Sequence, residues 1–226
     1  MTSYKLIRFK SREEWKKARL EGITATSASA VLGVNPWESI LETYIKITHK
    51  KEDTKEETEA MRKGNQAEPI VRELFKLNYG DEFVLRNPPS SNWIIVNKEK
   101  PYFLATPDGL LTNKVTKRKG GLECKFHEVL NNDDAINWRN GLLPNQYFVQ
   151  VLHTMNAGRF DFYFLGVILK HKKRKEDGTY VFDYYETRFF YFDAKELKEE
   201  LRYEEEKIDT FWNGNILTHT LPTITI

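Results

Sequence analysis

The chain has 226 residues, of which 40% are hydrophobic and 30% charged, and its formal net charge at pH 7 is +2. This balance allows a sizeable core, and it excludes a uniformly basic surface, so any positive patch for a polyanion has to be local. The single cysteine, Cys124, excludes an internal disulfide framework and a metal or iron–sulfur site built only from cysteines.

The sequence also bears on where the protein works. The first residues contain no apolar run long enough for a signal peptide. No run in the chain approaches the roughly 18 apolar residues that a membrane span needs. With one cysteine, these features favour a soluble protein of the cytosol that has no membrane partner. We find no repeat and no linker-like composition, and we predict a single domain over residues 1–226.

The first third of the chain is predicted to be mainly helical. Ser11 is a suitable N-cap for the first helix, a hydroxyl near Thr26 caps the second, and Gly33 ends it. Pro69 falls inside the fourth helix and either kinks it or starts a fresh one. Residues 49–59 contain no apolar side chain, which indicates a surface loop. The four helices are predicted over residues 11–20, 26–33, 39–48 and 58–78.

From residue 93 onward, the pattern alternates between strands and helices. Short runs rich in β-branched and aromatic residues, bounded by turn residues, are typical of strands. They cover residues 93–96, 102–106, 109–112, 120–126, 159–169 and 180–192. Helical periodicity covers residues 144–157 and 194–212. This order predicts a mixed α/β (α+β) fold with a central mixed sheet and helices on both of its faces.

Two short segments carry the chemistry. Residues 105–110 read Ala-Thr-Pro-Asp-Gly-Leu, so Asp108 follows a predicted strand at a sharp turn. Glu123 and Lys125 alternate with apolar neighbours on a later strand and therefore share one face. If the strands pair, the two carboxylates can hold a hard divalent cation beside a phosphodiester. Either segment alone is usually structural, since Asp-Gly turns are common hairpin signals.

Taken together, the Asp…Glu-x-Lys order resembles the core of the PD-(D/E)XK nuclease superfamily, which implies a restriction-endonuclease-like core. Three further blocks are similar to the YqaJ-like viral recombinases, a group that includes the phage lambda exonuclease. They are residues 15–37, with Gly-Ile-Thr-Ala-Thr and Asn-Pro-Trp, residues 64–69, Gly-Asn-Gln-Ala-Glu-Pro, and residues 146–151, Gln-Tyr-Phe-Val-Gln-Val. The four blocks follow the family's order.

The resemblance implies a metal centre. Asp108 and Glu123 would be ligands of the catalytic Mg2+, or of Mn2+ in its place, with help from the backbone carbonyl of Cys124. Glu68 would complete the acidic cluster, as a direct ligand or through a metal-bound water. Lys125 would orient the nucleophilic water and favour its deprotonated form. Magnesium prefers oxygen ligands and keeps several waters, which suits this donor set.

The resemblance also implies roles for residues around the metal. Gln150 would hold the nucleophilic water, and Tyr147 would pack or hydrogen-bond nearby. Arg19 and Thr26 would bind the 5′-terminal phosphate, with Ser27 as an alternative hydroxyl donor. A bidentate Arg suits a terminal phosphate better than a Lys does.

The function implied is a deoxyribonuclease of the phage recombination type. It would be a Mg2+-dependent 5′→3′ exonuclease that acts on double-stranded DNA ends, releases 5′-phosphomononucleotides and leaves 3′ overhangs for a single-strand annealing protein. The family further implies a homotrimer in the bacterial host cytoplasm. Two alternatives stay open: an endonuclease or single-strand nuclease of the same fold, and a noncatalytic DNA-binding recombination adaptor. Trp37 and Trp138 are expected in the core rather than between bases.

Overall fold

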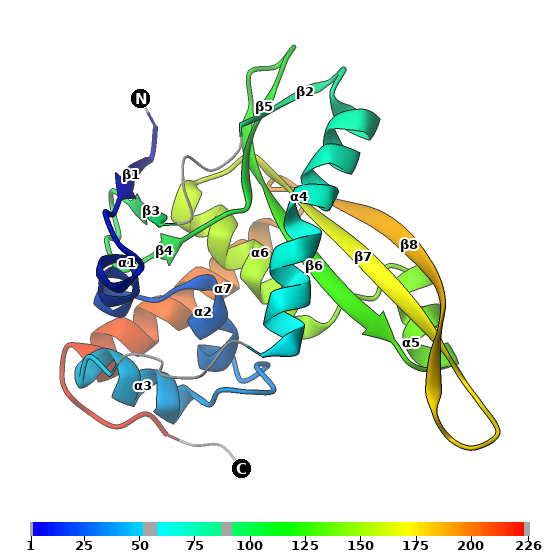
Figure 1. Ribbon diagram of the computed structural model, residues 1–226. Coiled ribbons are helices and arrows are strands. Elements are labelled where there is room, and N and C mark those ends of the chain that lie inside the picture. Colours follow the sequence, from blue (N-terminus) through cyan, green and yellow to red (C-terminus); the bar gives the residue numbers. More distant parts are fainter. Residues whose placement is uncertain (1, 52–57, 87–91, 224–226) are drawn as a thin grey trace.

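The computed structural model describes residues 2–51, 58–86 and 92–223. Its centre is a five-stranded mixed sheet in the order β2-β5-β6-β7-β8, beside a three-stranded antiparallel sheet in the order β1-β3-β4 (Figure 1). The strands are β1 (Tyr4–Arg8), β2 (Phe83–Arg86), β3 (Trp93–Asn97), β4 (Leu104–Ala105), β5 (Gly109–Asn113), β6 (Lys119–Val129), β7 (Phe162–Arg174) and β8 (Tyr180–Asp193).

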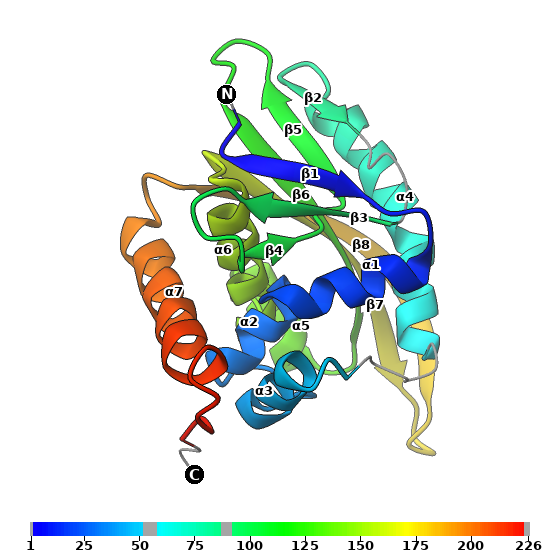
Figure 2. The same ribbon diagram turned by 90° about the vertical axis from the view of Figure 1, so that its left-hand side faces the viewer.

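Seven α-helices surround the sheets in the described part of the chain. They are α1 (Arg12–Ala18), α2 (Ala25–Val31), α3 (Ile40–Thr48), α4 (Glu59–Tyr79), α5 (Asn132–Arg139), α6 (Asn145–Gly158) and α7 (Lys198–Phe211). A 3-10 turn at Arg19–Glu21 follows α1, and a π-helical turn at Trp212–Ile216 follows α7. Figure 2 shows the small sheet between α7 and α4 in that view.

The middle of the large sheet is buried on both faces. Strands β6 and β7 run parallel at its middle, and successive side chains point to opposite faces. Leu122 and Phe164 pack with Val71 of α4 on one face. On the other face, Leu165 packs with Val151 of α6. Helices thus cover both faces (Figure 1), and the predicted mixed α/β fold with a central sheet flanked by helices is confirmed.

The small sheet is joined to the segment before α2. Ile23 forms a parallel bridge with Phe103, and the Ile23 N–H donates to Tyr102 O at 2.7 Å. Gly22 makes this approach possible, because a Cβ there would lie 2.6 Å from Tyr102 O. The chain before α2 and the chain around β4 are therefore hydrogen-bonded directly to each other.

Several local predictions need correction. The N-cap of α2 is Thr24 rather than Thr26, since Thr24 has extended backbone and its Oγ1 accepts from the Ser27 N–H at 3.4 Å. Helix α4 continues through Pro69, so no fresh helix begins there. Burial of α4 against the large sheet on both sides of Pro69 outweighs the lost backbone hydrogen bond. Of the predicted loop 49–59, residues 52–57 lie outside the described residues.

Other elements are shorter than predicted, or were missed. The predicted strand 102–106 shrinks to two paired residues in β4, and the last helix begins at Lys198 rather than near residue 194. Strands β1 and β2 and helix α5 were not predicted. Trp138 is 1% exposed, as expected, whereas Trp37 is 68% exposed and its predicted core position is wrong. No described helix combines the length and apolar character that crossing a bilayer requires.

Candidate active site

Strand pairing brings the two predicted carboxylates together. Gly109, the first residue of β5, pairs with Leu122 of the antiparallel strand β6. One step further along this register, Asp108 and Glu123 lie opposite each other. The predicted geometry needs one correction, because the strand before Asp108 belongs to the small sheet and the strand after it pairs with β6. Asp108 therefore stands where the chain crosses from one sheet to the other.

These side chains line a cavity of about 450 Å³. On one wall lie the carboxylates of Glu68, Asp108 and Glu123, with Lys125 and Gln150. A second group of lining residues, the phosphate wall, comes from the segment between α1 and the first turn of α2, and it includes Trp15, Arg19, Thr24 and Thr26. A cluster of acids beside a cluster of hydroxyls and a guanidinium can hold a cation and a phosphate at the same time.

Asp108 is held by a hydrogen bond, and its surroundings disfavour its charged form. Its Oδ2 accepts a hydrogen bond from the Cys124 N–H at 2.7 Å. Burial, reinforced by the charges of Glu123 and Glu68, raises the pKa of Asp108 well above its usual range, and Lys125 opposes this only in part. A cation bound near Asp108 and Glu123 would relieve both their repulsion and the loss of hydration of Asp108.

Lys125 lies beside the acids as a cation. Its Nζ donates to Glu123 Oε1 at 2.5 Å and lies 5.5 Å from the centre of the Tyr147 ring. Burial alone would lower the pKa of Lys125, but the carboxylates of Glu123 and Asp108 raise it overall. Tyr147 thus packs against the ammonium group, which is the first of its two predicted modes, and it is not among the residues that line the cavity.

Glu68 approaches the site from α4, and a residue that sequence reasoning missed accompanies it. Arg72 Nη1 donates to Glu68 Oε2 and to the backbone oxygen of Asp108, each at 3.4 Å. The guanidinium therefore ties α4 to the Asp108 turn. The spacing of Glu68 and Arg72, four residues apart on a predicted helix, was the available signal.

Gln150 reaches the cavity from α6, the helix on the other side of β6. Its side chain is buried, at 8% exposure, and lines the cavity together with Glu123 and Lys125.

The predicted phosphate-binding residues occupy the opposite wall, with one exception. The Arg19 guanidinium carbon lies 4.5 Å from the Trp15 ring centre, and Trp15 Nε1 donates to Trp93 O at 3.0 Å. Thr26 lines the cavity, but Ser27 lines only an adjoining cavity of about 540 Å³ that shares Arg19 and Thr26. Thr24, which was not predicted, lines both.

The donor set fits a hard cation with few protein ligands. Within residues 2–51, 58–86 and 92–223, no group of three or more His, Cys, Asp or Glu side chains is placed to hold a metal ion. Asp108 and Glu123 supply oxygen ligands, and Mg2+ characteristically keeps waters in its remaining positions. The Cys124 side chain is buried on the α4 face of the sheet, so only its backbone is available to the site.

The sequence and the fold were compared with known proteins. Residues 14–159 match the family described as the YqaJ-like viral recombinase domain. Protein YqaJ of Bacillus subtilis (strain 168) is 28% identical over 152 residues, which is 65% of this chain and 42% of that protein. The chain thus matches less than half of this relative's length.

Two solved structures are similar in fold. The alkaline exonuclease LHK-Exo from Laribacter hongkongensis, and the same protein in complex with dAMP, each superimpose with a TM-score of 0.58 over 92% of this chain and 95% of theirs, at 18% identity. At this identity the likeness shows a shared fold. The family match covers more than half of the chain and confirms the predicted resemblance, and the chain belongs to the YqaJ-like viral recombinase domain family.

Proposed function

We propose that the protein is a Mg2+-dependent 5′→3′ exonuclease that acts on double-stranded DNA ends. The observation that carries the proposal is one cavity with Asp108, Glu123 and Lys125 on one wall and Arg19 with Thr26 on the other. It would release 5′-phosphomononucleotides and leave 3′ single strands for an annealing protein. Membership of a recombinase family supports this, as does the fold shared with an alkaline exonuclease that binds dAMP.

The acidic wall would perform the hydrolysis. Asp108 and Glu123 would hold the cation, which when bound supplies charge neutralisation of the phosphodiester and a lowered pKa for water. Glu68 would act through a metal-bound water, which is the second of its two predicted roles. The reason is that Glu68 does not join Asp108 and Glu123 in a group of three side chains placed to bind one metal ion in the described chain. Lys125 would favour the hydroxide form of the attacking water by its positive charge, and Gln150 would orient that water.

The opposite wall would select DNA ends. The Arg19 guanidinium, backed by the Trp15 ring, can form two parallel hydrogen bonds to a terminal phosphate. The hydroxyls of Thr26 and Thr24 add neutral donors without adding charge. A site that must hold a terminal phosphate cannot be filled by an unbroken strand, so the proposed enzyme requires an end.

The test compares three substrates: linear duplex with 5′ phosphates, linear duplex with 5′ hydroxyls, and covalently closed circular DNA. In Mg2+ or Mn2+, the phosphorylated linear duplex should be degraded fastest and the circle should stay intact, and a chelator should abolish degradation. Cutting of the circle would show an endonuclease instead. Binding of DNA with no hydrolysis in any cation would show a noncatalytic adaptor.

The assembly proposed for the protein is a homotrimer around the duplex, on family analogy. Light scattering at several concentrations should give three times the 26.7 kDa chain mass. A mass that stays at one chain under the conditions in which DNA is degraded would remove the ring from the proposal and leave the exonuclease itself in place.

A further inference from the structure

A fully buried histidine lies behind the cavity. His153 is on α6, three residues after Gln150, and is 0% exposed. Its ring stacks on Phe103 with centroids 5.1 Å apart and planes 10° apart. It touches no substrate in the proposed reaction, so its polar contacts need another explanation.

One edge of the ring joins the two walls of the cavity. His153 Nε2 lies 2.9 Å from Ile23 O and 3.2 Å from Leu104 O. Backbone oxygens only accept, so Nε2 carries a hydrogen and donates to both. Ile23 immediately precedes Thr24, the N-cap of α2, on the wall with Arg19. Leu104 begins β4, which leads directly to the turn that carries Asp108.

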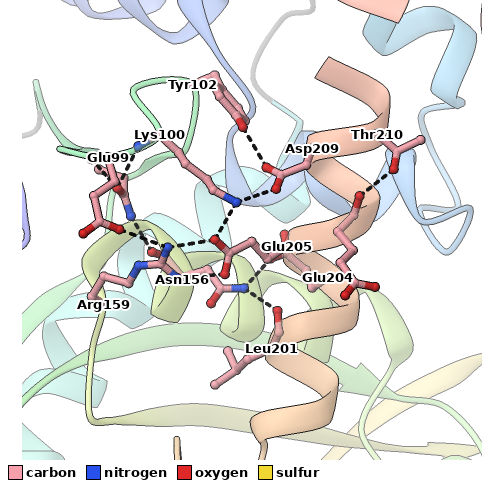
Figure 3. A network of polar contacts seen from close by, with 12 residues as sticks. Glu99, Lys100, Tyr102, Asn156, Arg159, Leu201, Glu204, Glu205, Asp209 and Thr210 are labelled. Atoms are coloured by element: carbon pink, nitrogen blue, oxygen red, sulfur yellow. Dashed lines mark hydrogen bonds and ion pairs between the residues drawn. The ribbon is translucent and has the colours of Figure 1, made fainter. Parts of the chain in front are cut away.

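The other edge fixes the ring in place. His153 Nδ1 lies 2.8 Å from Glu204 Oε1, and Glu204 on α7 is also 0% exposed. The second oxygen of Glu204 accepts from Asn156 Nδ2 at 2.6 Å, and the same amide donates to Leu201 O (Figure 3). A buried carboxylate is tolerated only when its hydrogen bonds are satisfied. Because Glu204 on α7 is held in this way, it fixes the orientation of the imidazole ring.

Helix α7 is itself anchored from both sides. Arg159 donates two parallel hydrogen bonds to Glu205, at 2.8 and 2.7 Å, and Lys100 bonds to both Glu205 and Asp209 (Figure 3). These contacts connect α7 to the loop between β3 and β4 and to the end of α6. The imidazole is therefore held between α6, which carries it, and α7, which is bonded to its neighbours through Arg159 and Lys100.

We propose that His153 is a positioning residue that fixes the joined Ile23 and Leu104 segments relative to α6, and thereby places the 5′-phosphate wall and the Asp108 turn against the rest of the metal-binding site. The inference rests on the proposed function, because a mononucleotide product requires the terminal phosphate and the cut phosphodiester to be one nucleotide apart. The Ile23 and Leu104 segments stay joined to each other through the Leu104 N–H, which donates to Ile23 O at 2.9 Å, but loss of the Nε2 donor removes the bonds that tie them to α6. The expected consequences are weaker discrimination of 5′-phosphorylated ends and products of mixed length.

Two substitutions separate this role from simple packing. In His153→Gln the side-chain amide nitrogen takes the place of Nε2, whereas in His153→Asn it takes the place of Nδ1. Affinity for 5′-phosphorylated and 5′-hydroxyl duplex ends is measured by fluorescence anisotropy in Ca2+, and product length is measured on end-labelled duplex in Mg2+. The phosphate preference should fall roughly tenfold in His153→Asn, with dinucleotides appearing, and stay within about twofold of the parent in His153→Gln.

The chain offers a matched control. His171 on β7 also contacts a carboxylate, Glu186, at 3.0 Å and also stacks on a ring, that of Tyr184 at 4.2 Å, but both partners lie on the neighbouring strand β8 rather than on the segments that carry the cavity residues. His171→Asn should leave both the preference for 5′-phosphorylated ends and the product length unchanged. If His153→Asn does not fold, Glu204→Gln replaces it and should lower the phosphate preference in the same direction.

The outcomes distinguish the two proposals. Failure of the parent protein to hydrolyse any linear duplex would overturn the proposed exonuclease activity. The ratio of affinities for 5′-phosphorylated and 5′-hydroxyl ends, measured in Ca2+, would still test the role of His153. A folded His153→Asn protein that keeps the parental phosphate preference and releases only mononucleotides would overturn the positioning role. An equal loss of the preference for 5′-phosphorylated ends in His153→Asn and His171→Asn would overturn the positioning role as well.

Discussion

Glu123 and Lys125 point to the same face of β6, and Glu123 Oε1 accepts a hydrogen bond from Lys125 Nζ at 2.5 Å. The ammonium group therefore compensates a carboxylate that would otherwise repel Asp108. A cation held by the two acids would weaken this ion pair, because the metal and the ammonium compete for the same oxygen. Lys125 would then be available to the attacking water.

Replacement of Lys125 should abolish chemistry while leaving binding. In Lys125→Ala, we expect the hydrolysis rate to fall by about 100-fold or more, the scale for a group that assists proton transfer, with DNA affinity little changed. Lys119→Ala is the control, since Lys119 is an exposed residue of the same strand. Single-turnover rates with saturating enzyme separate the two effects, and a parental rate in Lys125→Ala would remove this residue from the mechanism.

Asp108→Asn should separate cation binding from stability. The raised pKa of Asp108 shows that its charged form is disfavoured in the folded state. A neutral amide should therefore leave the melting temperature at pH 7 unchanged or higher, provided that its oxygen still accepts from Cys124. Mg2+ should raise the melting temperature of the parent, by linkage, but not that of Asp108→Asn. An equal Mg2+ effect in both proteins would place the cation elsewhere.

The ion pair between Glu205 and Arg159 predicts how stability depends on acid. Hydrogen bonds from Arg159, opposed by burial and assisted by Lys100, lower the pKa of Glu205 to about 2. A carboxyl whose folded pKa is lowered stabilises the fold above its unfolded pKa, about 4.3, and this contribution is lost as the pH falls toward about 2.

Glu205→Gln should thus lower the free energy of unfolding at pH 7 by about 1 kcal/mol or less, because the pair is partly solvated. The difference from the parent should shrink between about pH 4.3 and pH 2 in urea titrations. Glu200→Gln, on an exposed position of the same helix, should show no such pH dependence. A gap between parent and Glu205→Gln that widened in acid would contradict the assigned sign.

The two tryptophans that were predicted to share an environment should differ sharply. Trp138 is almost fully buried between Tyr147 and Phe190, whereas Trp37 projects from a turn after α2. We expect Trp138→Ala to cost about 3–5 kcal/mol of unfolding free energy, and Trp37→Ala to stay within about 0.5 kcal/mol of the parent. Urea unfolding followed by circular dichroism measures both, and similar losses would contradict the placement.

The placement of Glu123 and Lys125 in the candidate site was predictable because its signals are local. Glu123 and Lys125 alternate with Leu122 on one strand, and period-two alternation alone places them on one face. Asp108 was correctly expected near them, but the strand named as its support was wrong, because which strands pair is a nonlocal property. The Asp108 turn had to be located through the β5–β6 register rather than through the strand before it.

Other features depended on contacts that no local pattern contains. Thr24 became the N-cap of α2 because Gly22 lets the chain approach Tyr102, which fixes where the helix can start. Helix α4 passes through Pro69 because its apolar side chains pack against the large sheet. Strand β1 is largely exposed and pairs with β3, nearly ninety residues away in the chain, so composition alone did not mark it.

The middle of the large sheet and the α1–α2 segment contribute to the cavity in different ways. Glu123 and Lys125 are fixed by hydrogen-bonded neighbours on each side of β6, while Arg19 and Thr26 stand on short helical pieces at the rim. If the proposed function holds, substitutions in those short helical pieces would alter which terminus is accepted without disturbing the strands that hold the acids. In the proposed enzyme, changes in substrate choice and changes in bond cleavage would therefore arise in different parts of the fold.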